Sequence, residues 1–456
     1  MKEPTQIEPA RRSARERLVV FGESQLDRIP QLACLDREQH RAIRIVAQVL
    51  PFRVNRYVVE ELIDWKRVPD DPIFQLTFPQ PGMLEPAHFQ RVADLLRRGA
   101  SREALRHEVE GIRLQLNPHP AGQQKHNVPF FEGAPLEGAQ HKYRETVLVF
   151  PGQGQTCHSY CTFCFRWAQF VGMRDLRFAA TDVGRVLRYL AQHREVTDLL
   201  LTGGDPMVMK AHVLARYLEP LLEERFEHIS TVRIGTKSLT FWPQRFVTDD
   251  DADDVLRLFE RLSKAGKHVA FMAHFDHWRE METEICRTAI RRLQNAGIVL
   301  RSQAPLLQHV NDSAQTWARM WRMQVELGIV PYYMFVERDT GARRYFEVPL
   351  GRGWNIYRNA LQRVSGLGRT ARGPSMSTGA GKIEIQGVTE ILGREVFALR
   401  FIQARNPEWV QKPFFARFDP EASWWDDLQP AFGDESFFFE DEYRRICAQR
   451  ESVRAM

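Results

Sequence analysis

The sequence predicts an α/β protein with a mostly parallel sheet, preceded by a helical region and followed by a C-terminal extension. Between residues 146 and 336, six short runs rich in β-branched and aromatic residues alternate with amphipathic segments of helical length. Parallel neighbours need crossovers of this length, and the right-handed rule leaves a doubly wound sheet or a barrel. Polar residues follow each run, which favours a β/α barrel, since all its strand ends open on one catalytic face.

The region from residue 1 to about 135 is predicted to be helical and rich in loops. Apolar residues recur at i, i+3 and i+4 in 36–50, 86–99 and 102–116, which indicates three helices. The prolines of segment 68–82 predict an extended or turned chain. We expect this region to act as a helical cap ahead of the sheet.

Predicted strands and helices alternate regularly in the core. The strands are 146–150, 197–204, 230–236, 268–275, 298–303 and 330–336. The helices between them are 181–193, 211–223, 251–265, 280–296 and 313–327. Two further strand-like runs, 388–392 and 395–401, precede an aromatic and acidic tail that we expect to be a packing segment or a lid. The predicted divisions are 1–135, 136–345, 346–400 and 401–456.

The composition is that of an ordinary globular protein. Of the 456 residues, 43% are hydrophobic and 27% are charged, and 63 basic against 58 acidic residues give a formal net charge of +5. The basic residues are scattered, which argues against nucleic acid as a partner. The apolar run 18–21 is too short for a signal peptide and no run is long enough for a membrane span, so we expect a cytoplasmic protein.

Three of the six cysteines lie close together in the sequence. Cys157, Cys161 and Cys164 have the spacing C-x3-C-x2-C, and six cysteines are too few for a disulfide framework in so long a chain. A structural zinc ion needs four protein ligands, and His158 is poorly placed to be the fourth. A [4Fe–4S] cluster held by three cysteines leaves one iron free for a small molecule. The other three cysteines are expected to be plain buried thiols.

The cysteine loop "QTCHSYCTFCFR" resembles the cluster-binding motif of the radical S-adenosylmethionine (SAM) superfamily, in which the open iron chelates the amino and carboxylate groups of SAM. Phe163, just before the third cysteine, agrees with the usual form of that motif. The resemblance implies a partial (β/α)6 barrel. "LTGGDP" (201–206) resembles the segment that binds the SAM amino group, although it would also suit a simple turn from strand to helix. The implied SAM contacts are Gly203, Gly204, Asp205, His274 and Gln303.

Together these segments resemble the lysine 2,3-aminomutase family. The resemblance covers about residues 60 to 400 and includes "VRIGTKS", "AGIVLRSQAPLLQHVND", "PYYMF" and "GAGK". Members of this family move an α-amino group to the β-carbon with SAM, an iron–sulfur cluster and pyridoxal 5′-phosphate (PLP). The resemblance therefore implies an isomerase, an intramolecular aminotransferase, with a [4Fe–4S] cluster, SAM and PLP as cofactors and an amino acid as its small-molecule substrate.

The resemblance also implies which residues bind PLP. Lys382, at the end of "STGAGK", stands at the position of the lysine that forms the Schiff base with PLP. "GAGK" is not a nucleotide-binding P-loop, because the flanking positions lack the Gly and the Ser or Thr of that motif. Lys142 and Tyr143 stand where the family has an Arg–Tyr pair that reaches the phosphate. Lysine in place of arginine keeps the charge and loses the two-pronged contact. Tyr332 is a further implied PLP contact.

The implied substrate site departs from that of the lysine enzymes. Arg166, at the end of the cysteine loop, matches the residue that binds the substrate α-carboxylate. Arg338 and Ser375 stand where two aspartates hold the distant ammonium group of lysine. A cation and a hydroxyl complement an anion or a neutral polar group, so we expect an acidic or polar substrate and not lysine. The alternative is that Arg338 pairs with its neighbours Glu337 or Asp339.

Two other functions remain open at this point. The first is a radical SAM enzyme of another reaction type that does not use PLP. The second is a non-catalytic protein that binds an iron–sulfur cluster or zinc. The aminomutase and the radical SAM enzyme that does not use PLP would both need a reductant such as flavodoxin or ferredoxin. Ser313 replaces one cysteine ligand of the zinc site that joins subunits in the lysine enzymes, so we expect any homo-oligomer to form without that site.

Overall fold

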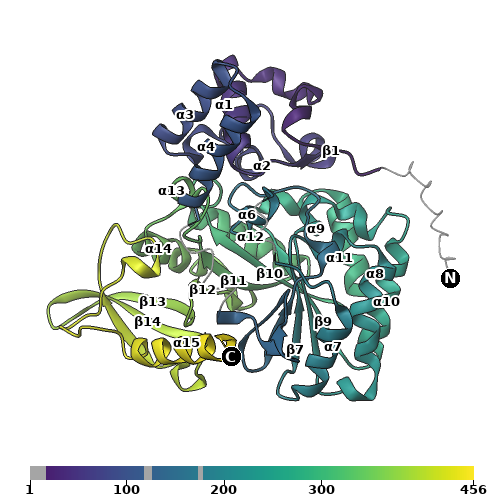
Figure 1. Cartoon of the computed structure of the whole chain (residues 1–456), viewed down its shortest axis with the longest axis vertical. Helices are drawn as coiled ribbons and strands as arrows, with labels where there is room; N and C mark the ends of the chain where they lie inside the picture. Colours follow the sequence, from purple (N-terminus) through teal and green to yellow (C-terminus); the bar gives the residue numbers. More distant parts are fainter. Residues whose placement is uncertain (1–16, 118–125, 173–177, 456) are drawn as a thin grey trace, which may run out of the picture.

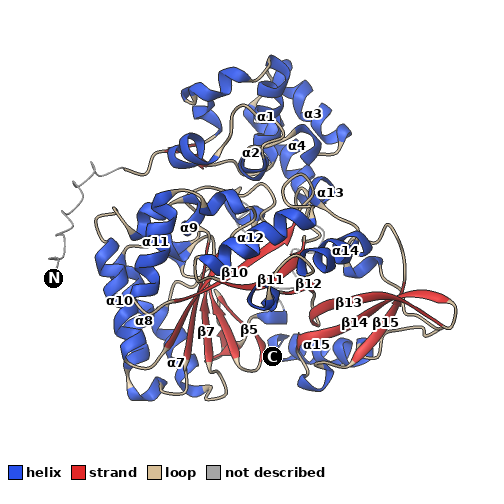
Figure 2. Ribbon diagram, turned by 180° about the vertical axis from the view of Figure 1, so that it is seen from behind, coloured by secondary structure: helices blue, strands red, loops and turns tan. Residues whose placement is uncertain are grey.

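The computed structural model describes residues 17–117, 126–172 and 178–455 of the chain. At its centre is an 11-stranded sheet with the order β15-β14-β13-β12-β11-β10-β9-β8-β7-β6-β5. The N-terminal helical region lies at one end of this core, and the C-terminal extension lies beside it (Figures 1 and 2). The α/β class predicted from the sequence is confirmed.

Six neighbouring strands of the sheet match the six predicted runs. They are β6 (Thr146–Val149), β7 (Asp198–Leu201), β8 (Thr231–Thr236), β9 (His268–His274), β10 (Val299–Leu306) and β11 (Val330–Val336). Each pairs in parallel with the next along the chain. Right-handed crossovers between sequential neighbours put the connecting helices on one face of the sheet. This order therefore excludes the doubly wound alternative, in which the strand order reverses.

The predicted helices of the core are also confirmed. They are α7 (Val183–Gln192), α8 (Ala211–Leu218), α10 (Ala252–Lys264), α11 (Glu284–Asn295) and α12 (Ala314–Glu326). They cover the outer face of the fan of parallel strands in Figure 2. Within the described parts of the chain, no helix combines the length and the apolar composition that crossing a membrane requires.

The described part of the N-terminal region contains the three predicted helices and a further α-helix, α2, that was not predicted. The helices are α1 (Arg37–Val49), α2 (Pro72–Thr77), α3 (Pro86–Arg97) and α4 (Arg102–Gln115). The prediction of an extended or turned chain at 68–82 is wrong where α2 forms. Asp71 caps this helix by accepting hydrogen bonds from the backbone N–H groups of Ile73 and Phe74, at 3.0 and 2.9 Å. Pro72 occupies the first helical position, where a proline is tolerated.

The C-terminal extension continues the same sheet. Its elements are β12 (Arg372–Ser377), β13 (Gly381–Ile391), β14 (Arg394–Ala404), β15 (Pro413–Arg417) and α15 (Glu440–Ala455), and β5 (Ala139–Tyr143) forms the opposite edge. β12 is parallel to β11, whereas β13, β14 and β15 are antiparallel. The two strand-like runs predicted at 388–392 and 395–401 form the tip and one arm of the β13–β14 hairpin. The aromatic tail packs on this hairpin, since the ring centroids of Phe401 and Phe439 are 4.7 Å apart.

The N-terminal region is joined to the core through the cysteine loop. Trp167 from this loop and Phe74 from α2 belong to one buried hydrophobic cluster. Asn55 is fully buried between the two parts, and its amide donates to the carbonyl oxygens of His158 at 3.3 Å and Phe241 at 2.7 Å. Its Oδ1 accepts from the backbone N–H of Val58 at 3.0 Å. One side chain therefore satisfies three buried backbone groups.

Replacement of Asn55 by alanine is expected to destabilise the protein, because these three backbone groups lose their partner. An unsatisfied buried polar group costs about 1–3 kcal/mol, so Asn55→Ala is expected to lower the apparent free energy of unfolding by about 2–4 kcal/mol. Urea denaturation followed by circular dichroism checks this. Asn359→Ala, on an exposed face of the helix Leu350–Leu361, is the matched control. Equal unfolding curves for the two variants would contradict the prediction.

Candidate active site

The cysteine loop follows β6 and is held from two sides. On the N-terminal side, the backbone N–H of Tyr160 donates to the Arg53 carbonyl at 2.7 Å, and that of Thr162 donates to the Leu76 carbonyl at 3.0 Å. Within the loop, the N–H of Cys164 donates to the Cys161 carbonyl at 3.2 Å. The loop is therefore a tight turn clamped between the helical region and the strand ends.

The three thiols of the loop are half-buried, and each of them lies close enough to another to affect its pKa. Burial raises the pKa of Cys157 and of Cys161 well above the usual value for a thiol, and raises that of Cys164 to about 11. The other two thiols also raise the pKa of Cys157, and the backbone N–H of Arg166 lowers that of Cys164. Thiolates at these positions need a nearby positive charge, which iron ions would supply. The loop therefore fits a metal cluster.

The arrangement does not resemble a site for a single metal ion. Among the described residues, no three His, Cys, Asp or Glu side chains are gathered around one point at metal-ligand distance. In an iron–sulfur cluster each cysteine binds a different iron, so the thiols need not meet at one point. The spacing of Cys157, Cys161 and Cys164 agrees with a site for an iron–sulfur cluster.

Gly203 and Gly204, at the end of β7, lie directly against the cysteine loop. A Cβ atom on Gly204 would be 2.4 Å from the carbonyl oxygen of Thr156, and one on Gly203 would be 2.5 Å from Nε2 of Gln155. Gly203 also has a φ of +152°, which favours glycine. These two residues are glycines for a packing reason, whether or not they also contact SAM.

Asp205 connects the cysteine loop to the end of β8. Its backbone N–H donates to the Thr156 carbonyl at 2.8 Å. Its buried carboxylate accepts from the Thr236 hydroxyl at 2.8 Å, the Lys237 backbone N–H at 2.9 Å and the Ser238 hydroxyl at 3.0 Å. Burial raises the pKa of Asp205, and these hydrogen bonds oppose the rise. The carboxylate is thus engaged within the protein, and the structure gives it a positioning role.

His274, the last residue of β9, is paired with Gln303, which lies within β10. The His274 ring is 5.7 Å from the ring of Phe163 in the cysteine loop, and its Nε2 is 3.1 Å from Oδ1 of Asp276. The implied SAM contacts therefore come from β9, β10 and the residues after β7, and His274 and the glycines lie beside the loop.

Sequence reasoning missed a buried charge network next to this loop. The ammonium of Lys237 lies 2.7 Å from Oδ2 of Asp276 and 2.7 Å from Oε1 of Glu280. Burial alone would lower the pKa of Lys237, but the two carboxylates raise it. The lysine therefore stays charged, and its charge also acts on the thiol of Cys161. The motif "GTKS" after β8 was the available signal in the sequence.

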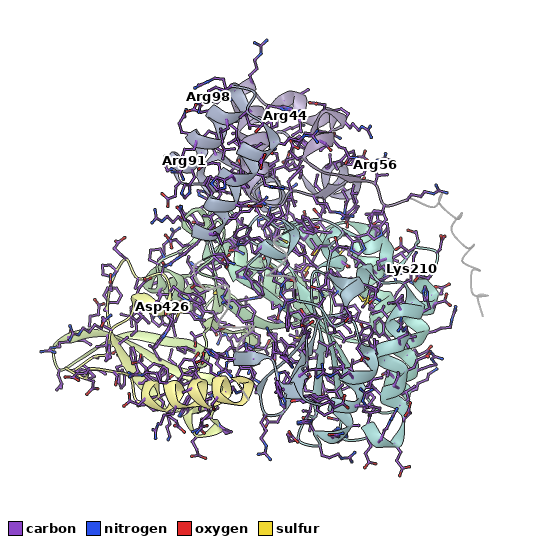
Figure 3. All side chains as sticks on the ribbon, in the orientation of Figure 1. Arg44, Arg56, Arg91, Arg98, Lys210 and Asp426 are labelled. Atoms are coloured by element: carbon purple, nitrogen blue, oxygen red, sulfur yellow. The ribbon has the colours of Figure 1, made fainter. Side chains whose placement is uncertain are left out.

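A cavity of about 600 Å³ lies between the parallel strands and the C-terminal extension. Its basic residues are Lys142, Arg166, Arg233, Arg338, Lys382, Arg405 and Arg444. Its acidic residues are Asp339, Asp426 and Glu440, and Asp426 comes from the C-terminal part of the chain (Figure 3). The excess of cations favours an anionic ligand. Five residues predicted from the resemblance line this cavity together: Lys142, Tyr143, Arg166, Arg338 and Lys382.

Lys382 lies at the start of β13, with its amine inside the cavity wall. Its Nζ is 4.4 Å from the ring centroid of Tyr333 and 5.7 Å from that of Phe335. Burial, together with Arg233 and Arg372, lowers the pKa of Lys382 to about 7. A large fraction of the amine is therefore uncharged at neutral pH, as attack on an aldehyde requires. This residue fits a Schiff-base lysine.

Arg166 links the cysteine loop to the cavity. Its Nη1 donates to the Gly203 carbonyl at 3.0 Å, and its guanidinium lies 4.3 Å from the ring centroid of Phe150. Burial lowers the pKa of Arg166 to about 10, so the side chain remains charged at neutral pH. A fixed guanidinium at this place can donate two parallel hydrogen bonds to a carboxylate.

Arg338 lies near two aromatic rings in the cavity wall, one of which, Phe165, also contacts Arg166. Its guanidinium is 5.6 Å from the ring centroid of Phe165 and 5.4 Å from that of Trp424. Its Nε is 3.7 Å from Oδ1 of Asp339, so the alternative pairing with a neighbour is present. Trp424 belongs to the aromatic tail, which therefore packs on the hairpin and also forms part of the cavity wall.

Two residues that were predicted to bind PLP or the substrate, both within the described part of the chain, do not line the cavity. The ring of Tyr332 lies beside Arg301 and Arg372, at 5.2 and 4.5 Å from their guanidinium groups. Ser375 is fully buried, and its hydroxyl donates to the Met334 carbonyl at 3.5 Å. The tyrosine whose ring lies next to the amine of Lys382 is Tyr333, the second tyrosine of "PYYMF". Successive strand residues point to opposite faces, and the motif alone did not say which tyrosine faces the lysine.

Comparison with known proteins gives several relatives over most or half of the chain, although no family model matches. A protein of Aquifex aeolicus with the provisional name L-lysine 2,3-aminomutase is 32% identical over 394 residues, covering 86% of this chain and 91% of that protein. The L-lysine 2,3-aminomutase of Escherichia coli is 30% identical over 251 residues, which cover 52% and 68%. The glutamate 2,3-aminomutase of Clostridioides difficile is 28% identical over 211 residues, which cover 46% and 47%.

A solved structure, Streptococcus suis SuiB, matches 62% of this chain and 59% of its own, at 14% identity and a TM-score of 0.36. This likeness is too weak to bear on function.

The lowered pKa of Lys382 predicts unusual reactivity at neutral pH. With its pKa at about 7, the rate of reductive methylation by formaldehyde and a hydride donor should rise up to about pH 7 and level off above it. Site-resolved mass spectrometry measures this rate, with the exposed Lys264 as the reference residue in the same sample. A Lys382 rate that still climbs steeply at pH 9 would contradict the prediction.

Proposed function

Because the chain belongs to the lysine 2,3-aminomutase family of radical SAM enzymes, we propose that it is a PLP-dependent 2,3-aminomutase acting on an acidic or polar amino acid. One observation carries this proposal. Lys382, whose amine has a lowered pKa, and Arg166 line the same cationic cavity. Arg166 also belongs to the three-cysteine loop and so joins that loop to the cavity. Family membership supports the radical SAM chemistry, whereas the PLP requirement and the substrate are proposed here.

The residues that would hold the cofactors are distributed around one end of the sheet. Cys157, Cys161 and Cys164 would bind the [4Fe–4S] cluster, and the surrounding strand ends would hold SAM. Lys382 would anchor PLP, with Lys142 and Tyr143 near its phosphate. When bound, the cluster and SAM supply the radical that removes a hydrogen atom, and PLP supplies the conjugated ring that assists the movement of nitrogen.

The protein's own contribution is to position and enclose the substrate. Arg166 would hold the α-carboxylate, and the 3.0 Å hydrogen bond to the Gly203 carbonyl fixes its guanidinium relative to the cysteine loop. This places the α- and β-carbons near the source of the radical. Trp424 and Tyr443, from the tail, line the cavity on the other side and limit access of water and oxygen.

Arg338 is the basis for the proposed substrate class. In this wall a substrate carboxylate would meet a guanidinium that lies near two rings, whereas the ammonium of lysine would meet a like charge. Asp339 balances part of the charge of Arg338, and the guanidinium still contributes positive charge to this part of the cavity. An acidic amino acid is the leading candidate. A flavodoxin or ferredoxin would serve as the reductant.

The substrate proposal predicts the effect of reversing the charge at residue 338. Wild-type protein loaded anaerobically with cluster and PLP should convert glutamate, aspartate or a polar amino acid faster than lysine. Arg338→Asp should lower kcat/KM for the preferred substrate by about 10- to 100-fold, the loss typical of a charge-assisted hydrogen bond, and should improve the relative rate with lysine. Mass spectrometry of the β-amino acid products measures both. Faster turnover of lysine than of every acidic or polar amino acid by the wild type would refute the substrate assignment.

The PLP requirement predicts a covalent adduct at one lysine. Borohydride reduction of PLP-treated protein should leave a phosphopyridoxyl group on Lys382, and peptide mass spectrometry should find none at that position in Lys382→Ala. Both proteins should still produce 5′-deoxyadenosine from SAM and a reductant, because the cysteine loop is intact. Absence of the adduct in wild-type protein, with 5′-deoxyadenosine still formed, would favour the radical SAM enzyme that does not use PLP.

A further inference from the structure

Arg405 is a cavity residue that sequence reasoning did not identify. It follows the last residue of β14, and its backbone N–H donates to the Ala380 carbonyl at 3.0 Å. In the β13–β14 ladder, Lys382 is paired with Gln403, two residues before Arg405. Two strand residues span about 7 Å, and alternate residues share a face. Arg405 is therefore displaced along the sheet from Lys382, toward the loop Ser377–Ala380.

The hydrogen bonds of the Arg405 guanidinium go to uncharged acceptors. Its Nε donates to the Gly379 carbonyl at 2.8 Å, its Nη1 to the His126 carbonyl at 3.2 Å, and its Nη2 to the amide oxygen of Asn127. Burial and the neighbouring Arg450 lower the pKa of Arg405. Arg405 also forms a hydrogen bond with the phenol group of Tyr443. These contacts fix the orientation of the guanidinium beside the cavity, and all of their acceptors are uncharged.

Lys142 approaches the same loop from the opposite edge of the sheet. Its ammonium donates to the Thr378 carbonyl, next to the Gly379 carbonyl that Arg405 contacts. Burial and then Arg405 are the main causes that lower the pKa of Lys142. Two half-buried cations thus lie on consecutive carbonyl groups, an arrangement that an anion between them would stabilise.

Three other cations of the cavity have carboxylate partners, while Arg166 and Lys382 are already assigned to the substrate carboxylate and the Schiff base. Arg233 forms a two-pronged contact with Asp198, at 2.8 Å for one of the two hydrogen bonds. Arg444 lies 2.7 Å from Asp441, and Arg338 lies 3.7 Å from Asp339. The contacts of Lys142 and Arg405 described above are instead with neutral oxygen atoms, which marks their end of the cavity as the place for a multiply charged anion.

We propose that Arg405 and Lys142 together bind the phosphate group of PLP, with Arg405 providing the two-pronged contact that Lys142 cannot make. This assignment rests on the proposed function, since it assumes that PLP is the ligand of Lys382. PLP carries its aldehyde and its phosphate on one small ring, so both anchors must face one cavity, as Lys382, Lys142 and Arg405 do. The C-terminal hairpin then supplies both the Schiff-base lysine and the phosphate-binding arginine.

The test compares PLP with pyridoxal, which lacks the phosphate. Equilibrium titrations followed by absorbance, and trapped adduct at Lys382 quantified after borohydride, should show that Arg405→Gln binds PLP about 10- to 100-fold more weakly than wild type. Pyridoxal binding should be unchanged. Arg405→Lys should lie between the two, because it keeps the charge and loses the planar fork. Arg394→Gln, at the exposed far end of β14, is the matched control and should bind PLP as wild type does.

Each other outcome has a distinct meaning. Wild-type PLP affinity in Arg405→Gln would overturn the assignment and leave the proposed function standing. An equal loss of PLP and pyridoxal would show that Arg405 only supports the fold of the cavity, and would overturn the assignment as well. Wild-type protein that forms no adduct with either compound would overturn the proposed function and this assignment together. Competition by inorganic phosphate, strong in wild type and weak in Arg405→Gln, would support the assignment.

Discussion

The buried carboxylate of Asp205 is the constraint on which the geometry of the site depends. It accepts hydrogen bonds from the residues that follow β8, while its own backbone N–H holds the cysteine loop. Gly203 and Gly204 permit this contact, because a side chain at either position would overlap the loop. The Gly203 carbonyl in turn orients Arg166. The cysteine loop, two strand ends and Arg166 are therefore fixed relative to one another before any ligand binds.

The cavity beyond Arg166 concentrates positive charge that the protein neutralises only in part. Some of its arginines are paired with aspartates, and others lie on carbonyl groups or aromatic rings. Burial of such groups costs free energy unless an anion is present. Burial lowers the pKa of Lys382, and the charges of Arg233 and Arg372 lower it further. An anionic ligand would therefore be favoured by the same arginines that help to keep this amine uncharged.

The sequence predicted those parts of the fold and site that depend on local pattern. The six parallel strands follow from runs such as 230–236, whose composition is that of a buried strand. The motif residues Cys157 and Lys382 were recognisable because their neighbours in the chain are characteristic. Arg405 was not predictable, because its role arises from the pairing of β13 with β14 and from contacts with residues almost 280 positions away. The choice between Tyr332 and Tyr333 depended on an irregular register of β11, which no local pattern reveals.

The C-terminal extension supplies the part of the cavity wall that the parallel strands do not. The edges of the sheet are β5 and β15, and Lys142 on β5 lines the same cavity as Lys382 on β13. Side chains connect β5 and its neighbourhood to the extension, since Lys142 donates to the Thr378 carbonyl and Arg450 from α15 donates to the His126 carbonyl. In Figure 1 the C-terminal helix lies beside the edge of the parallel strands. Because these connections are cationic side chains and not strand pairing, an anion bound beside them would stabilise the contact between β5 and the extension.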